Sequence, residues 1–153
     1  MNWFVMSRRF NKTNPEDFGF IIVDGMIISP IDQSVWKPKN LYDFGWGQEN
    51  GYYKTPLPEF SELMRIILEE SDEDDIYGSA AIIIEMFPEE LLLYLESIET
   101  LTRDIKEKLN KVFVLFKPIN RTFKNQMSLE EVKSEYERWL KISKKFQYLN
   151  LRN

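Results

Sequence analysis

Two residue types that carry much of enzyme chemistry are missing from this 153-residue chain, which has no cysteine and no histidine. The first absence excludes disulfides, thiolate zinc sites and cysteine nucleophiles. The second excludes Ser-His-Asp triads, imidazole metal ligands and histidine general bases. The sequence also has no glycine-rich phosphate loop followed by Lys-Ser/Thr and no GxSxG motif. We therefore predict a non-enzymatic protein that needs no cofactor.

Long apolar runs are missing as well. The most apolar stretch, residues 79–95, is interrupted by three glutamates and a proline, so we expect no bilayer span. Near the N-terminus, Arg8 and Arg9 follow a short apolar run, whereas a secretory signal places its basic residues before a longer one. The expectation is a cytoplasmic protein that does not bind membranes.

The composition is that of a globular chain, with 43% apolar and 14% aromatic residues. Its length suits a single domain, 1–153, that can bury a sizeable core. We predict a β-rich and loop part over 1–54 and a helical part over 55–153. The fold class is α+β: an N-terminal antiparallel β-hairpin or small sheet followed by four to five helices.

The N-terminal part shows strand signals. Residues 2–10 alternate imperfectly and suggest one strand. Asp24-Gly25 lies between two β-branched runs, which is a strong hairpin signal. We predict antiparallel strands over 19–23 and 26–29, joined by a two-residue turn.

Residues 30–53 are less regular, because glycines punctuate a series of aromatic side chains. One interpretation is a partner-binding loop, since Trp and Tyr are favoured at interaction hot spots. The candidate side chains are Trp36, Trp46, Tyr52 and Tyr53. The interpretation we favour is a long loop that lies over the core, with its rings as anchors. Asn50-Gly51 is a further candidate turn of a small hairpin.

The centre of the chain, residues 55–101, has the strongest helical periodicity. Apolar residues recur at i, i+3, i+4, i+7 and i+8 over 60–68, as on one face of a helix. The acidic run 69–75 breaks this pattern, and a second helix begins within it, with Asp75 among the candidate capping residues. Pro88 ends that helix near Phe87. The two helices make a helical hairpin.

Three further helices are expected. The third covers 89–98, and the fourth runs from the N-cap Thr102 to about residue 116, although the β-rich segment 112–116 is alternatively a strand. The last begins at the capping box Ser128 to Glu131 and reaches about residue 146. Its predicted inward stripe is Leu129, Val132, Tyr136, Trp139 and Leu140.

The segments 75–81 and 87–92, with their small and apolar positions, resemble the helix pairs of HEAT-type units and helical stretches of small bacterial immunity proteins. The resemblance covers about residues 55–101. It implies a paired-helix surface and an immunity protein or antitoxin that binds a toxin domain. An ordinary helical hairpin packed on a core is the alternative.

Charge is distributed unevenly along the chain. Residues 1–58 are neutral, residues 59–104 carry fourteen acidic and two basic side chains, and residues 105–153 carry five acidic and twelve basic ones. The basic last helix is expected to neutralise part of the acidic segment. The remaining acidic surface would attract a basic protein and repel nucleic acid. The predicted partner is a basic protein, with no nucleic acid.

The acidic run also raises the question of a divalent metal. Counted from Asp72, a calcium loop would need an oxygen ligand at Ile76 and glycine at Tyr77, so that motif fails. The EExxE form of 69–73 occurs on helices of all-α nucleotide pyrophosphatases of the MazG type. Their second ExxD motif has only a partial counterpart at 96–99. A carboxylate-dependent nucleotide hydrolase is therefore the alternative function, and no metal ligand is assigned.

These observations predict a protein–protein interaction protein, with an immunity protein or antitoxin as the specific case and a regulatory adaptor as a further alternative. The oligomeric state is left open. The candidate partner-binding residues are Glu69, Glu70, Asp72, Glu73, Asp74, Asp75 and the four aromatic residues Trp36, Trp46, Tyr52 and Tyr53.

Overall fold

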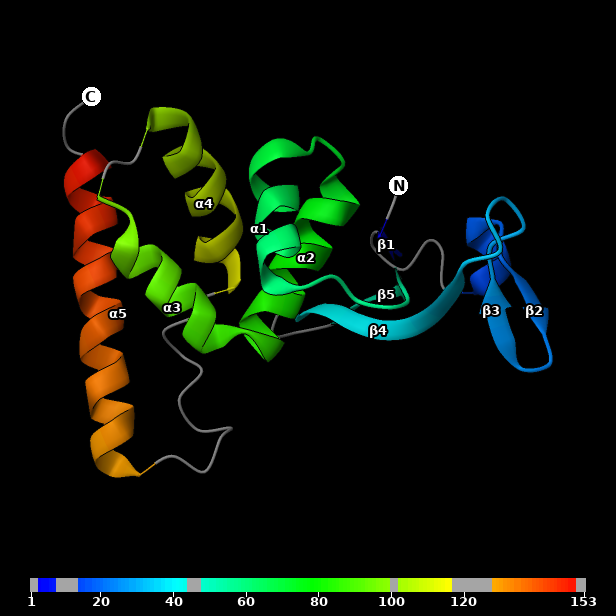
Figure 1. Cartoon of the computed structure of the whole chain (residues 1–153), viewed down its shortest axis with the longest axis horizontal. Coiled ribbons are helices and arrows are strands. Elements are labelled where there is room, and N and C mark those ends of the chain that lie inside the picture. Colours follow the sequence, from blue (N-terminus) through cyan, green and yellow to red (C-terminus); the bar gives the residue numbers. More distant parts are fainter. Residues whose placement is uncertain (1–2, 8–13, 44–47, 100–101, 117–127, 151–153) are drawn as a thin grey trace. The chain divides into compact units, whose positions relative to one another are not determined.

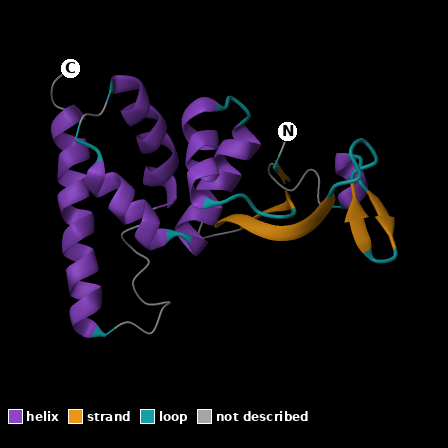
Figure 2. Cartoon of the chain, viewed as in Figure 1, coloured by secondary structure: helices purple, strands orange, loops and turns teal. Residues whose placement is uncertain are grey.

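The computed structural model describes residues 3–7, 14–43, 48–99, 102–116 and 128–150. Within these residues the chain is α+β, with an N-terminal five-stranded antiparallel sheet followed by five α-helices (Figures 1 and 2). The chain forms two compact units, Met1–Ile82 and Ile83–Asn153. The predicted single domain stays a prediction. The last strand ends at Lys54 and the first α-helix begins at Phe60, so the strands precede the α-helices along the chain.

The sheet has the spatial order β1-β5-β4-β3-β2, so β1 and β2 are its edges. The strands are β1 (Phe4–Met6), β2 (Ile21–Val23), β3 (Met26–Ile28), β4 (Val35–Asp43) and β5 (Gln48–Lys54), with a short 3₁₀ helix η1 (Pro15–Phe18) before β2. The predicted hairpin is confirmed: β2 and β3 pair through a turn in which Asp24 has φ 50° and Gly25 has φ 78°. Positive φ at both central residues is the signature of a type I′ turn.

The predicted loop over residues 30–53 is wrong. Most of this segment forms β4 and β5, which pair with each other along most of their length. The predicted turn at Asn50-Gly51 is also wrong, because Gly51 lies inside β5, opposite Met6 on one side and Lys39 on the other. A proline and several glycines obscured the period-two pattern, and pairing on both sides of β5 outweighs their low strand propensity.

One face of the sheet carries a small aromatic core. The strand registers place Val5, Tyr52 and Trp36 on the same face. Together with Phe20 they form a buried cluster, in which the rings of Phe20 and Trp36 lie 4.8 Å apart. Phe18 and Ile27 pack against this cluster.

The opposite face of the sheet meets α2 (Glu73–Met86) at the β1 edge. The Phe4 side chain is fully buried there. Gly78 of α2 lies against the Phe4 ring so closely that a Cβ at position 78 would overlap it. A residue without a side chain at this point allows the helix to approach the strand.

The other α-helices are α1 (Phe60–Glu69), α3 (Pro88–Ser97), α4 (Arg103–Phe116) and α5 (Leu129–Asn150). Residues 112–116 belong to α4, which settles the choice between helix and strand. Pro88 separates α2 from α3, as predicted. The predicted N-caps are confirmed: the Ile105 N–H donates to Thr102 Oγ1 at 3.3 Å, and the Glu131 N–H donates to Ser128 Oγ at 3.2 Å.

Helix α5 is longer than predicted and ends at Asn150. Trp139 and Ile142 are buried, but Leu129 is 85% exposed and Tyr136 is 45% exposed, so the place of these two residues on the predicted inward stripe is wrong. Periodicity identifies which face of a helix is apolar, but it does not show where along the helix a neighbour covers that face.

Candidate functional site

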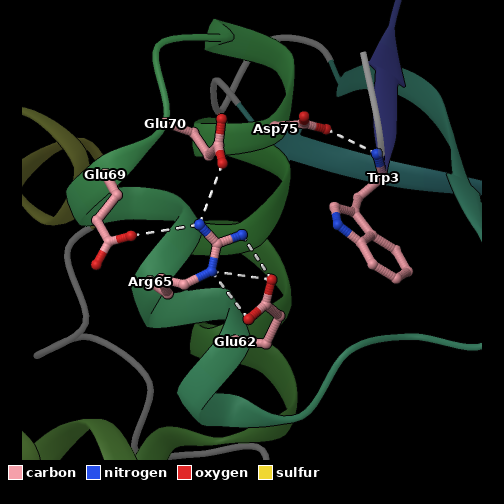
Figure 3. Close-up of polar contacts among 6 residues, drawn as sticks. All are labelled: Trp3, Glu62, Arg65, Glu69, Glu70 and Asp75. Carbon is pink, nitrogen blue, oxygen red and sulfur yellow. Dashed lines mark hydrogen bonds and ion pairs between the residues drawn. The ribbon is translucent and has the colours of Figure 1, made fainter.

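The acidic region begins on α1 with a cluster of four side chains, Glu62, Arg65, Glu69 and Glu70, which we call the Arg65 cluster. The Arg65 guanidinium lies 2.7 Å from a Glu62 oxygen, 3.4 Å from Glu69 and 3.1 Å from Glu70 (Figure 3). Glu62 and Glu69 are one turn before and after Arg65, the helical spacing at which opposite charges meet. One guanidinium therefore faces three carboxylates.

The Arg65 cluster is partly exposed, and its charges shift one another's pKa. Hydrogen bonds from Arg65 lower the pKa of the Glu62 carboxyl below its ordinary value. Hydrogen bonds to these carboxylates, that of Glu62 first, raise the pKa of the Arg65 guanidinium above its ordinary value. The Glu69 side chain is 65% exposed, so it offers negative charge to the solvent even while it contacts Arg65.

The next acidic residue, Asp72, caps helix α2. Its Oδ1 accepts a hydrogen bond from the Asp75 N–H at 3.0 Å. Burial raises the pKa of Asp72, but backbone hydrogen bonds from Asp75 and Asp74 contribute to holding it below its usual range. The prediction that Asp75 caps the helix is therefore wrong, since Asp72 occupies that position and Asp75 lies within the first turn.

Asp75 and Asp74 instead bind the backbone of β1. Asp75 Oδ1 accepts a hydrogen bond from the Trp3 N–H at 2.9 Å (Figure 3) and another from the Phe4 N–H at 3.0 Å. Asp74 Oδ2 accepts one from the Met6 N–H at 3.3 Å. With only 1% of its surface exposed, Asp75 does not belong to an exposed acidic surface.

These hydrogen bonds close one edge of the sheet. On the β5 side, the Trp3 C=O accepts a hydrogen bond from the Lys54 N–H at 2.8 Å, and the Ser7 N–H donates to the Asn50 C=O at 2.8 Å. Because alternate residues of a strand point to opposite sides, the N–H groups of Phe4 and Met6 point away from β5. The carboxylates of Asp75 and Asp74 satisfy these outward donors, where another strand would otherwise pair.

The candidate aromatic side chains do not form a binding loop. Trp36 is 3% exposed and Tyr52 is 8% exposed, and both belong to the aromatic core. Burial, together with the charges of Glu16 and Asp17, raises the pKa of Tyr52. Tyr53 is half-buried, and Trp46 lies outside the described residues.

The basic last helix neutralises part of the acidic segment, as expected. Arg138 of α5 pairs with Glu89 at 3.0 Å and with Glu96, both on α3. These hydrogen bonds lower the pKa of Glu96. The acidic segment thus has two different neutralising arginines, Arg65 and Arg138.

The carboxylates of the alternative hydrolase motif have other partners in the structure. Glu69 and Glu70 contact Arg65, and Glu96 contacts Arg138. Across the part of the chain that the structure describes, no three Asp or Glu side chains gather as a metal site would require. Among the same residues, no helix combines the length and apolarity needed to cross a membrane.

Sequence reasoning missed one surface, the hairpin of β2 and β3. Ile21, Ile22, Val23 and Met26 are each between 41% and 54% exposed. A signal was present: residues 20–23 are apolar without alternation, whereas a strand with one solvent face alternates apolar and polar residues.

Comparison of the chain with protein-family models, curated proteins and solved structures finds no match.

Proposed function

We propose that this chain is a cytoplasmic protein–protein interaction protein that binds a basic protein through the acidic region of α1 and the start of α2. The specific case is an immunity protein or antitoxin whose partner is a basic toxin domain. The observation that carries the proposal is the excess of carboxylates: residues 59–75 include eight acidic side chains and only Arg65 as a base.

Some acidic side chains of this region have partners within the protein and some are exposed. Asp72, Asp74 and Asp75 are engaged with the protein's own backbone. The carboxylates of Glu59, Glu69 and Glu73 are exposed and that of Glu70 is half-exposed, so these side chains support binding of a basic partner. Grouped charges of one sign raise the association rate of an oppositely charged protein, and salt weakens the effect.

The test uses the double variant Glu69→Lys/Glu73→Lys, which leaves the capping and β1-binding aspartates intact. Tagged wild-type protein would capture the partner from the native host. We expect the on-rate for that partner to fall by about tenfold in the variant and to lose most of its salt dependence. Stopped-flow or surface plasmon measurements at several salt concentrations would show this.

A matched control is Glu130→Lys/Glu137→Lys, which makes the same change in net charge at exposed positions of α5. Its on-rate should stay within about twofold of the wild type. An equal loss of on-rate in both variants would mean that only net charge matters, and no loss of on-rate in either variant would refute binding through the acidic surface.

Co-expression then tests the specific case. A partner that is toxic alone and harmless with this chain supports immunity, and a harmless partner supports an adaptor.

A further inference from the structure

The hairpin of β2 and β3 exposes apolar side chains on both of its faces. The register pairs Ile22 with Ile27 on one face, and Ile21 with Ile28 and Val23 with Met26 on the other. Ile27 packs against the aromatic core, but Ile22 on the same face is 54% exposed. Such a contiguous apolar patch on an edge hairpin is typical of an interaction site.

The outer side of β2 also has unused backbone groups. Val23 and Met26 flank the two-residue turn and are a hydrogen-bonded pair, so Ile22 is at a non-hydrogen-bonded position. Its N–H and C=O therefore point away from β3. Among the described residues no strand lies on that side of β2 (Figure 1). At the opposite edge, Asp74 and Asp75 occupy the equivalent donors of β1.

The edge strand β2 is three residues long and lacks the protective residues that most edge strands carry. Edge strands are commonly guarded by lysine, proline or an inward charge, and Ile21–Val23 has none of these. The sequence around the strand is acidic: residues 14–34 include four acidic side chains and no Lys or Arg, and one of the four, Asp32, pairs with Lys54. Asp24 follows β2 directly and Glu16 lies in the 3₁₀ turn before it, so exposed carboxylates stand at both ends.

We propose that the outer edge of β2 binds an extended segment of a basic protein partner as an additional antiparallel strand. The backbone of Ile22 would bond to the incoming strand, and alternate apolar side chains of that strand would cover Ile21 and Val23, which lie on the same face. Lys or Arg at its two ends would meet Asp24 and Glu16. A second copy of this chain is a poorer fit, because antiparallel β2–β2 pairing would bring the same carboxylates together.

This surface is distinct from the Arg65 cluster, and its test is independent of the one above. The probe is a short synthetic peptide in which valine and threonine alternate, with lysines at both ends. In an NMR titration of the full chain, we expect the largest amide shifts at 21–28 and slowed hydrogen exchange at the Ile22 N–H. A control peptide with glutamates in place of the lysines should bind at least about tenfold more weakly.

Two variants separate the backbone from the charge contribution. Ile22→Pro removes the outward N–H without removing a β2–β3 hydrogen bond, and should weaken peptide binding by at least about tenfold. Glu16→Gln/Asp24→Asn removes two carboxylates while Asn-Gly preserves the type I′ turn, and should weaken binding of the lysine peptide about fivefold. This second variant keeps the test decisive if Ile22→Pro does not fold.

The proposal would be overturned by peptide shifts that lie elsewhere on the protein, by no binding at all, or by equal binding of the lysine and glutamate peptides. It would also be overturned if the protein alone forms a dimer in sedimentation experiments and Ile22→Pro abolishes that dimer. In that case the β2 edge serves self-association.

Discussion

At the scale of single residues, the acidic run that the sequence presents as one feature divides into side chains with different tasks. Asp72 caps α2, and Asp74 and Asp75 bind the backbone of β1. Glu69 and Glu70 contact Arg65. A carboxylate at a helix start is stabilised by the backbone N–H groups and the helix dipole, which favours aspartate in this turn.

The first prediction concerns Asp75. Replacing it with alanine would leave the N–H groups of Trp3 and Phe4 without their acceptor, so Asp75→Ala should lower the free energy of unfolding by about 2–4 kcal/mol. Urea denaturation measures this. Asp75→Asn retains one acceptor oxygen and should lose less, and Glu73→Ala, at an exposed neighbour, should change stability by under ~0.5 kcal/mol. An Asp75→Ala midpoint equal to that of wild type would contradict the role in closing the edge.

At the scale of secondary-structure elements, β1 and β2 show two ways of ending a sheet. The edge at β1 is closed, because α2 supplies carboxylates to its outward N–H groups and covers Phe4. The edge at β2 has an apolar, exposed hairpin and no partner strand among the described residues. The proposed strand binding depends on this open edge, since exposed edges promote pairing with other chains.

The second prediction concerns the contact of α2 with β1. Gly78→Ala would place a methyl group on the Phe4 ring and should cost about 1–3 kcal/mol in a denaturation experiment. Adding Phe4→Leu should recover part of this loss by making room. The adjacent control is Ser79→Ala: the Ser79 hydroxyl is buried without a hydrogen-bond partner among the described residues, so its removal should be neutral or stabilising. Gly78→Ala with wild-type stability would show that the helix and strand separate easily.

At the scale of the whole molecule, charge is the dominant feature. The net charge is −5, yet the first 58 residues are neutral, the middle is strongly acidic and the last third is basic. Two arginines, one in each compact unit, gather several carboxylates around themselves. Folding therefore lowers the pKa of particular carboxyl groups, and stability depends on pH.

The third prediction follows from these pKa shifts. The pKa values of Glu62, Asp72 and Glu96 are all lowered in the folded protein. Such groups contribute stability above their unfolded pKa of about 4, and that contribution is lost as the pH falls through the folded pKa. The free energy of unfolding should therefore decrease below about pH 5. In the variant Glu62→Gln/Glu96→Gln this decrease should be shallower, and an unchanged slope would show that these pairs are fully screened by solvent.

Local chemistry in the sequence was sufficient for a definite part of the fold. The Asp24-Gly25 turn, the break at Pro88 and the caps at Thr102 and Ser128 all depend on a few neighbouring residues, so they were predictable. The absence of cysteine and histidine also needs no structure. The α+β class followed from the order of these local signals.

Only the tertiary structure decided where the remaining residues lie. Residues 35–43 and 48–54 form strands because pairing on both sides of β5 stabilises them. Asp75 is not on the predicted acidic surface, because its carboxylate accepts hydrogen bonds from backbone N–H groups at the edge of β1, about seventy residues earlier in the chain. Trp36 and Tyr52, two of the candidate partner-binding residues, are buried in a core built with Val5 and Phe20. Burial, edge pairing and exposure are set by partners distant in the sequence, and local residue patterns do not identify those partners.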